Sequence, residues 1–106
     1  MKISATILAA GASKRMGNRN KLLLLVDNKP IIYLVCEKVL KSKLDQIVLV
    51  TGHQNYKIEK VLPKGEYTII YNKDWSQGMM SSISSGMSQI DDDIIGNMVI
   101  LGDMPF

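Results

Sequence analysis

Two short stretches in which every residue is apolar constrain the fold of this chain most. Residues 47–50 read Ile-Val-Leu-Val, and residues 98–101 read Met-Val-Ile-Leu. A strand that is apolar on both faces needs cover on both faces, which is typical of a parallel sheet between helices. Four strands are predicted, at Ile3–Leu8, Gln46–Thr51, Tyr67–Tyr71 and Asn97–Leu101.

Segments with helical periodicity separate these strands. The first begins after Pro30, a residue that suits the first turn of a helix, and one face is formed by Ile31, Leu34, Val35, Lys38 and Val39. A shorter helix is expected at 55–62, and a third is marked by Ile83, Met87 and Ile90. Strands alternating with helices predict right-handed crossovers, and hence a three-layer α/β/α, Rossmann-like fold with a mostly parallel sheet.

The length of the chain allows one small domain. Its 106 residues end soon after the fourth apolar run, which has the composition of a central strand. We therefore expect residues 1–106 to be the N-terminal part of a longer domain, without its C-terminal part. An unpaired sheet edge in such a chain would favour self-association.

Composition and charge argue against several classes of protein. The formal net charge is only +3 and aromatic residues make up 6%, which does not favour a nucleic-acid-binding domain. A single cysteine, Cys36, excludes an intramolecular disulfide. No apolar run is long enough to span a bilayer, and no secretory signal is visible. We expect a soluble, cytoplasmic protein.

The densest motif follows the first strand, at Leu8-Ala9-Ala10-Gly11-Ala12-Ser13-Lys14-Arg15-Met16-Gly17. Its small residues let the backbone approach a ligand and offer N–H groups to phosphate oxygens. Ser13 adds a hydrogen-bond donor, while Arg15 and the later Lys21 add positive charge. The loop matches neither a Walker A motif nor a G-x-G-x-x-G fingerprint. From these residues alone, a phosphate-binding loop and an ordinary strand-to-helix turn are about equally favoured.

A second polar motif follows the third strand, at residues 72–83. Asn72 offers both a donor and an acceptor to a base or ribose, and Gly78 precedes a helix whose N-terminus could receive a phosphate. The alternative is a plain turn in which Trp75 packs on the sheet and serines such as Ser81 cap the helix. His53, at the end of the second strand, could also touch a nucleotide, although a lone histidine is more often structural.

Asp103 is the sharpest single candidate for metal binding. It follows the fourth apolar run, where the carboxyl end of a strand would place its carboxylate beside the nucleotide. Mg²⁺ is satisfied by carboxylate, water and triphosphate oxygens, so Asp103 is a candidate magnesium ligand. The run Asp91-Asp92-Asp93 is instead typical of a solvated turn.

Residues 8–17, together with Lys21-Leu22-Leu23, resemble the signature loop of the MobA-like NTP transferases, which belong to the nucleotide-diphospho-sugar transferase superfamily. The resemblance implies that this loop wraps the triphosphate and part of the base, and that Lys21 contacts phosphate. The family often has proline directly before this lysine and a two-residue spacer after the glycine. In this chain the spacer between Gly17 and Lys21 has three residues, Asn18-Arg19-Asn20, and no proline.

Two further motifs resemble one branch of that family, the molybdenum cofactor cytidylyltransferases. Residues 72–82 resemble the pattern N-P-D-W-x-x-G-M-x-x-S, with Lys73 in place of proline, and the chain has Ala9-Ala10-Gly11 where the guanylyltransferase branch usually has two glycines. Residues 102–105 resemble the metal-binding G-D-x-P motif of the family. The implied reaction is transfer of CMP from CTP to molybdopterin carrying molybdenum, with release of pyrophosphate.

The candidate residues are then as follows. Arg15, Lys21 and Asp103 are expected to be catalytic, and Asp103 is expected to bind Mg²⁺. The expected nucleotide contacts are Leu8, Ala9, Ala10, Gly11, Ser13, Lys21, His53, Asn72, Gly78 and Ser81. The alternatives are a guanylyltransferase, a cytidylyltransferase acting on a sugar or alditol phosphate, or a nucleotide-binding fragment without turnover.

Overall fold

The computed structural model describes residues 2–11 and 20–103, so Ser13 and Arg15 lie outside the described residues. The elements in chain order are β1 (Ile3–Ala9), η2 (Lys21–Leu23), β2 (Leu25–Val26), β3 (Lys29–Pro30), α1 (Ile31–Lys41), β4 (Gln46–Thr51), α2 (Asn55–Lys60), β5 (Thr68–Tyr71), η3 (Trp75–Gln77), α3 (Met79–Met87) and β6 (Gly96–Leu101). All four predicted strands and all three predicted helices are present, with small differences at their ends.

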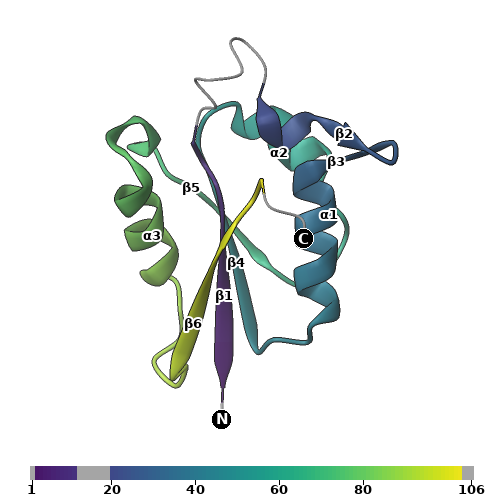
Figure 1. Ribbon diagram of the computed structural model, residues 1–106. Helices are drawn as coiled ribbons and strands as arrows, with labels where there is room; N and C mark the ends of the chain where they lie inside the picture. Colours follow the sequence, from purple (N-terminus) through teal and green to yellow (C-terminus); the bar gives the residue numbers. More distant parts are fainter. Residues whose placement is uncertain (1, 12–19, 104–106) are drawn as a thin grey trace.

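The main sheet has four parallel strands in the order β5-β4-β1-β6. Helices α1 and α3 cover its opposite faces, which gives three layers (Figure 1). The predicted α/β/α fold with a parallel sheet is therefore confirmed. Within the described ranges no helix is both long and apolar enough to cross a membrane.

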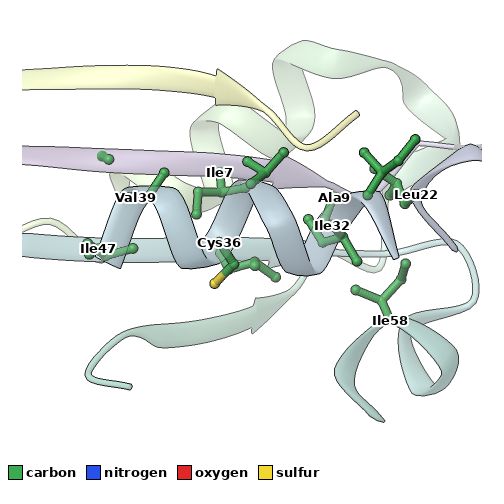
Figure 2. Packing of buried hydrophobic residues seen from close by; sticks show 12 residues of the cluster. Ile7, Ala9, Leu22, Ile32, Cys36, Val39, Ile47 and Ile58 are labelled. Carbon is green, nitrogen blue, oxygen red and sulfur yellow. The ribbon is translucent and has the colours of Figure 1, made fainter. Parts of the chain in front are cut away.

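The face of the sheet under α1 holds the larger apolar core. Ile7 of β1 and Leu49 of β4 are fully buried there, as are Ile32 and Cys36 of α1. Figure 2 shows these α1 side chains lying along the sheet, with Ile58 of α2 extending the cluster beyond the end of the helix.

The buried face of α1 differs from the predicted one. Ile31, Val35 and Val39 are buried as expected, but Ile32 and Cys36 complete the stripe. Of the other predicted members, Leu34 is half-buried and Lys38 is exposed. Ile31, Ile32, Val35, Cys36 and Val39 follow the spacing i, i+1, i+4, i+5, i+8, which is also compatible with one helical face.

The opposite face of the sheet is covered by small residues of α3. The predicted apolar face of this helix was wrong in part, because Met87 is 54% exposed while Ser82 and Gly86 are buried. A Cβ atom on Gly86 would lie only 2.5 Å from the Thr6 Cγ2 atom, so a side chain there would need the backbone to move. The helix therefore approaches the sheet more closely than a face of large apolar residues would allow.

Strand β6 lies at an edge of the described sheet rather than at its centre. Met98 and Val99 are about half exposed, because α1 and α3 lie mainly over β1 and β4. The prediction of a strand covered on both faces holds for β4 but not for β6. Self-association through this edge stays a prediction.

A small antiparallel hairpin formed by β2 and β3 was not predicted. Each strand has two residues, which is too short for a period-two pattern to be recognised in the sequence. Its turn is made by Asp27 and Asn28, with φ of 52° and 67°. Positive φ at both central residues is the requirement of a tight hairpin turn, and Asp and Asn tolerate it better than most residues.

Candidate functional site

The candidate site lies at the carboxyl end of β1, where the chain connections to its two neighbouring strands run on opposite faces of the sheet. From β1 the chain passes through α1 to β4 and β5 on one side, and then returns through α3 to β6 on the other side (Figure 1). Helices on opposite faces leave a crevice at the carboxyl ends of the two neighbouring strands, where open α/β sheets bind their ligands.

A pocket of about 560 Å³ is found at this point. It is lined by Leu8, Ala10, Gly11, Leu22, Trp75, Ser76, Gly78, Met79, Ser82, Leu101, Gly102 and Asp103. These residues come from the ends of β1 and β6, from η2, and from the segment that leads into α3. The first residues of the glycine loop, the second polar motif and the described part of the aspartate motif thus meet in one place, as the sequence predicted.

Two predicted catalytic residues lie close together beside this pocket. The Lys21 Nζ and Asp103 Oδ2 atoms are 3.4 Å apart, and both side chains are partly exposed. The three-residue spacer before Lys21 therefore does not prevent it from reaching the aspartate. In such a position the lysine ammonium can bind a phosphate and the carboxylate can bind a metal cation.

Gly102 places Asp103 at the end of the strand. Its N–H donates to the Leu8 carbonyl oxygen at 2.9 Å, which continues the β1–β6 pairing by one residue. A Cβ atom here would lie 2.7 Å from that same oxygen and 3.0 Å from the Ile32 Cδ1 atom. A glycine is therefore required for β6 to stay this close to β1, and Asp103 emerges directly from that contact.

The beginning of the glycine loop contributes both to the pocket and to the core. Leu8, Ala10 and Gly11 line the pocket as predicted. The side chain of Ala9 is 1% exposed and packs in the cluster under α1, on the other face of the sheet. This side chain therefore faces away from the pocket, and the predicted contact of Ala9 with a nucleotide stays a prediction. Ser13 and Arg15 fall in the part of the loop outside the described residues.

His53 does not line the pocket but packs against Trp75, which does. Its N–H donates to the Ala10 carbonyl oxygen at 2.9 Å, and its ring centroid is 5.0 Å from that of Trp75. A Cβ atom on Gly52 would overlap both Trp75 and the Ala10 carbonyl oxygen. Trp75 packs on Val48 and Val50 as the packing interpretation expected, and it also forms part of the pocket wall.

Asn72 and Ser81 shape the turn before α3. Asn72 is 4% exposed; its Oδ1 accepts from the Asp74 N–H at 3.0 Å, and its Nδ2 donates to Ser81 Oγ at 2.9 Å and to Ser82 Oγ at 3.0 Å. Its amide is thus engaged within the protein, and neither Asn72 nor Ser81 lines the pocket. Direct contact of either residue with a nucleotide stays a prediction.

Gly78 lines the pocket and begins α3 with a backbone that favours glycine. Its φ is 112° and its ψ is 173°, a combination that side chains make costly. Because Gly78 and Met79 both line the pocket, the N-terminal turn of α3 opens onto it. The partial positive charge of a helix N-terminus favours an anion in this position.

Several lining residues were not among the predicted contacts: Leu22, Trp75, Ser76, Met79, Ser82, Leu101 and Gly102. All of them lie within or beside the three motifs, so proximity in the sequence was the available signal. What could not be inferred is which side chains of each motif point inward, because that depends on strand register and on the path of η2.

Among the described residues that line the pocket, Asp103 is the one that carries a carboxylate. Among the described residues, no group of three or more His, Cys, Asp or Glu side chains could hold a metal ion. This donor set suits Mg²⁺ that shares its ligands with substrate phosphates, since Mg²⁺ is commonly held by one or two carboxylates plus phosphate and water. Asp91, Asp92 and Asp93 are exposed in the turn that precedes β6, and Asp93 forms an ion pair with Lys2.

Comparison with known families agrees with this geometry. The profile of the MobA-like NTP transferase domain matches residues 5–106, nearly the whole chain. This chain belongs to the MobA-like NTP transferase family. The resemblance inferred from the glycine loop and the G-D-x-P motif is thereby confirmed at the level of the family.

Individual relatives are similar over most of this chain but are much longer. A nicotine blue oxidoreductase from Paenarthrobacter nicotinovorans is 32% identical over 84 residues, which cover 79% of this chain and 41% of that protein. A nucleotidyl transferase from Methanothermobacter thermautotroptrophicus superposes with a TM-score of 0.83 at 26% identity, covering 98% of this chain and 51% of that structure. Rv0371c from Mycobacterium tuberculosis H37Rv gives a TM-score of 0.85 at 21% identity, covering 99% and 53%.

The chain therefore spans about half the length of these solved structures and less of the oxidoreductase. The names of the relatives describe different chemistry, an oxidoreductase and a nucleotidyl transferase. The activity of this family member has to be argued from its own site.

Proposed function

We propose that this MobA-like family member binds CTP with Mg²⁺ and transfers CMP to a phosphate-bearing acceptor, the molybdenum cofactor, with release of pyrophosphate. The observation that carries the proposal is the meeting of Lys21, Asp103 and the first residues of the glycine loop at the β1–β6 crevice. A ligand in this crevice would lie close to an ammonium group, a carboxylate and backbone N–H groups that it can approach closely.

Each described group has a defined part in this proposal. The space beside Gly11 is open, because a Cβ atom built there would have no described atom within 4 Å, so a ligand could approach its backbone. The N-terminal turn of α3 and the Lys21 ammonium would favour the negative charge of the triphosphate. Asp103 would hold Mg²⁺, which when bound would neutralise charge that develops on the phosphates.

The reaction itself needs little covalent work from the protein. A phosphate oxygen of the acceptor forms a new bond to the α-phosphorus, and the bond from that phosphorus to the bridging oxygen of pyrophosphate breaks. The protein would contribute positioning and electrostatic stabilisation rather than a nucleophile. That division suits a pocket in which Lys21 and Asp103 supply the charge.

The choice of CTP rests on the small side chain of Ala10 and on the residues around Trp75. Ala10 stands in the pocket lining where the guanylyltransferase branch usually has glycine, and its Cβ reduces the space that a base can use. Trp75, Gly78 and Met79 form part of the same lining. The same geometry also accommodates the alternatives with GTP or with a sugar phosphate acceptor, so the nucleotide has to be measured.

Calorimetric titration with CTP, GTP and ATP, with and without Mg²⁺, tests the proposal. We expect CTP to bind most tightly and only with Mg²⁺, and Asp103→Ala to weaken that binding at least about tenfold, as for loss of a charged hydrogen-bonding partner. Asp92→Ala removes an equal charge from an exposed turn and is the matched control. Tightest binding of GTP or ATP, or binding independent of Mg²⁺, would contradict the proposal.

Turnover is tested separately. Pyrophosphate release from CTP should begin only when molybdenum cofactor is supplied, and it should be lost in Asp103→Ala. Nucleotide binding without any release would favour the non-catalytic alternative, and release with a sugar or alditol phosphate would favour the other cytidylyltransferase.

A further inference from the structure

Asn20 lies directly before Lys21 and is almost completely buried, with 6% of its surface exposed. Its Oδ1 atom accepts a hydrogen bond from the Leu22 N–H at 3.0 Å, and its carbonyl oxygen accepts from the Leu23 N–H at 3.0 Å. Both bonds close the single turn of η2, which contains Lys21. Asn20 is therefore the N-cap of the turn that carries a proposed phosphate-binding lysine.

The capped turn rests against the end of β6. Leu22 is buried, and its Cδ2 atom is 3.2 Å from the position that a Cβ atom on Gly102 would take. The next residue after Gly102 is Asp103, whose carboxylate pairs with Lys21. By holding the Leu22 N–H, the Asn20 side chain thus fixes a turn in which one residue packs beside Gly102 and its neighbour reaches Asp103.

Asn20 has a φ of −85° and a ψ of 115°, an extended conformation usual for an N-cap, and it holds the turn through a side-chain hydrogen bond.

The Nδ2 atom of Asn20 is buried and has no hydrogen-bond partner among the described residues. The Oδ1 atom is therefore the described side-chain contact through which Asn20 acts on the turn.

We infer that Asn20 is a positioning residue, which acts on nucleotide through Lys21 by holding η2 so that the ammonium faces Asp103. The inference about nucleotide rests on the proposed function. The inference about the placement of Lys21 does not, because it concerns the free protein.

The first test uses the free protein. The chemical shift of the Asp103 carboxyl carbon is measured by NMR in the unaltered protein and in Asn20→Ala, Asn20→Ser and Lys21→Ala. We expect Asn20→Ala to move this signal most of the way towards its value in Lys21→Ala, and Asn20→Ser to leave it unchanged. An Asn20→Ala protein that keeps its fold and the original Asp103 signal would overturn the inference. If Asn20→Ala does not fold, Asn20→Gly removes the same acceptor at a smaller cost to the turn.

The second test measures binding of CTP with Mg²⁺ in a double-mutant cycle. Asn20→Ala should weaken binding about threefold to tenfold, as for loss of a cap, and should have no further effect when Lys21 is already alanine. Equal weakening in both backgrounds would show a general structural role and contradict the inference. If the unaltered protein binds no nucleotide, the proposed function fails, while the NMR result still decides the placement of Lys21.

Discussion

The two faces of the sheet differ in the size and polarity of the side chains that fill them. The α1 face is filled by large apolar residues such as Ile7, Ile32 and Leu49. The α3 face contains buried hydroxyl groups at Ser4 and Thr6, which both donate to the Asn97 Oδ1 atom, at 2.8 and 3.1 Å. Among the described residues, the buried members of its apolar cluster are Ala10, Val48 and Val50.

The difference shows how the chain combines stability with a site. The cluster under α1 contains more and larger buried apolar side chains than the cluster on the other face, and burial of such side chains stabilises the fold. On the other face, Ser82 and Gly86 let α3 lie close to the sheet, and the polar groups between them are hydrogen-bonded. The pocket opens at the end of this second face, with Ser82 in its lining.

The largest effect is expected from removing bulk on the α1 face. Ile32 is fully buried, so Ile32→Ala should lower the free energy of unfolding by about 2–5 kcal/mol through lost burial and a cavity. Leu34→Ala in the same helix is the matched control, and it should cost clearly less because Leu34 is only half-buried. Urea denaturation measures both. Equal losses would show that the buried stripe of α1 has been assigned wrongly.

A smaller effect, of opposite origin, is expected on the α3 face. Gly86→Ala should destabilise by about 1–3 kcal/mol through overpacking against Thr6, even though alanine is the better helix former. Thr6→Ser removes the clashing methyl group and should recover most of this loss in the double variant. Ser84→Ala, on the exposed side of α3, should be neutral or slightly stabilising. Thermal denaturation of the unaltered protein, Gly86→Ala, the double variant and Ser84→Ala measures these effects. If the double variant were no more stable than Gly86→Ala, close packing against Thr6 would not be the cause of the loss.

The smallest effect is expected at alkaline pH and comes from the α1 face, where the Cys36 thiol is buried among apolar side chains. Burial raises the pKa of the Cys36 thiol on the α1 face from 9.0 to about 11. The folded protein then holds this proton more tightly than the unfolded chain, so stability is complete below pH 9 and falls as pH rises towards 11. At pH 10 the loss should be roughly 1 kcal/mol.

Cys36→Ala tests the origin of that alkaline loss. The slope of unfolding free energy between pH 8.5 and about 10 should become shallower in this variant, whatever its stability at neutral pH. The pKa of Tyr67 is raised from 10.0 to about 12 by burial and by the neighbouring Cys36, so Tyr67 lowers stability mainly above pH 10 and contributes less than Cys36 within this window. An unaltered slope in Cys36→Ala would assign the alkaline loss to other groups.

The sequence was most informative where a pattern is local. Strand β4 was predicted with its bounds correct, because the continuous apolar run at residues 47–50 leaves little alternative to a covered parallel strand, and five of the six residues of β4 are buried. The approach of the glycine loop to Asp103 also followed from local reasoning, since parallel strands bring their carboxyl ends to one edge. The hairpin at Asp27 and Asn28 was missed because its strands are too short to show a period.

Side-chain direction was predicted less well than position. In α3, the spacing of Ile83, Met87 and Ile90 suggested an apolar buried face, but the methyl group of Thr6 leaves room only for Gly86. In the second polar motif, Asn72 was expected to meet a base or ribose; that contact stays a prediction, while the structure adds that the hydroxyl groups of Ser81 and Ser82 and the Asp74 N–H engage its amide. Both outcomes depend on partners that are distant in sequence or on the opposite side of a turn.

The amino-acid sequence by itself determined the fold class, the family and the three motifs of the site, because these depend on residue type and on spacing along the chain. Only the tertiary structure decided which members of each motif face the pocket, that Lys21 reaches Asp103, and that His53 supports Trp75. The physical reason is that these contacts follow from strand register, from close approach at Gly52, Gly86 and Gly102, and from the capped turn at Asn20. The strand register and the close approaches at the glycines join segments far apart in the sequence, where local propensity carries no information, whereas the turn at Asn20 is local and depends on tertiary structure only for its packing beside Gly102.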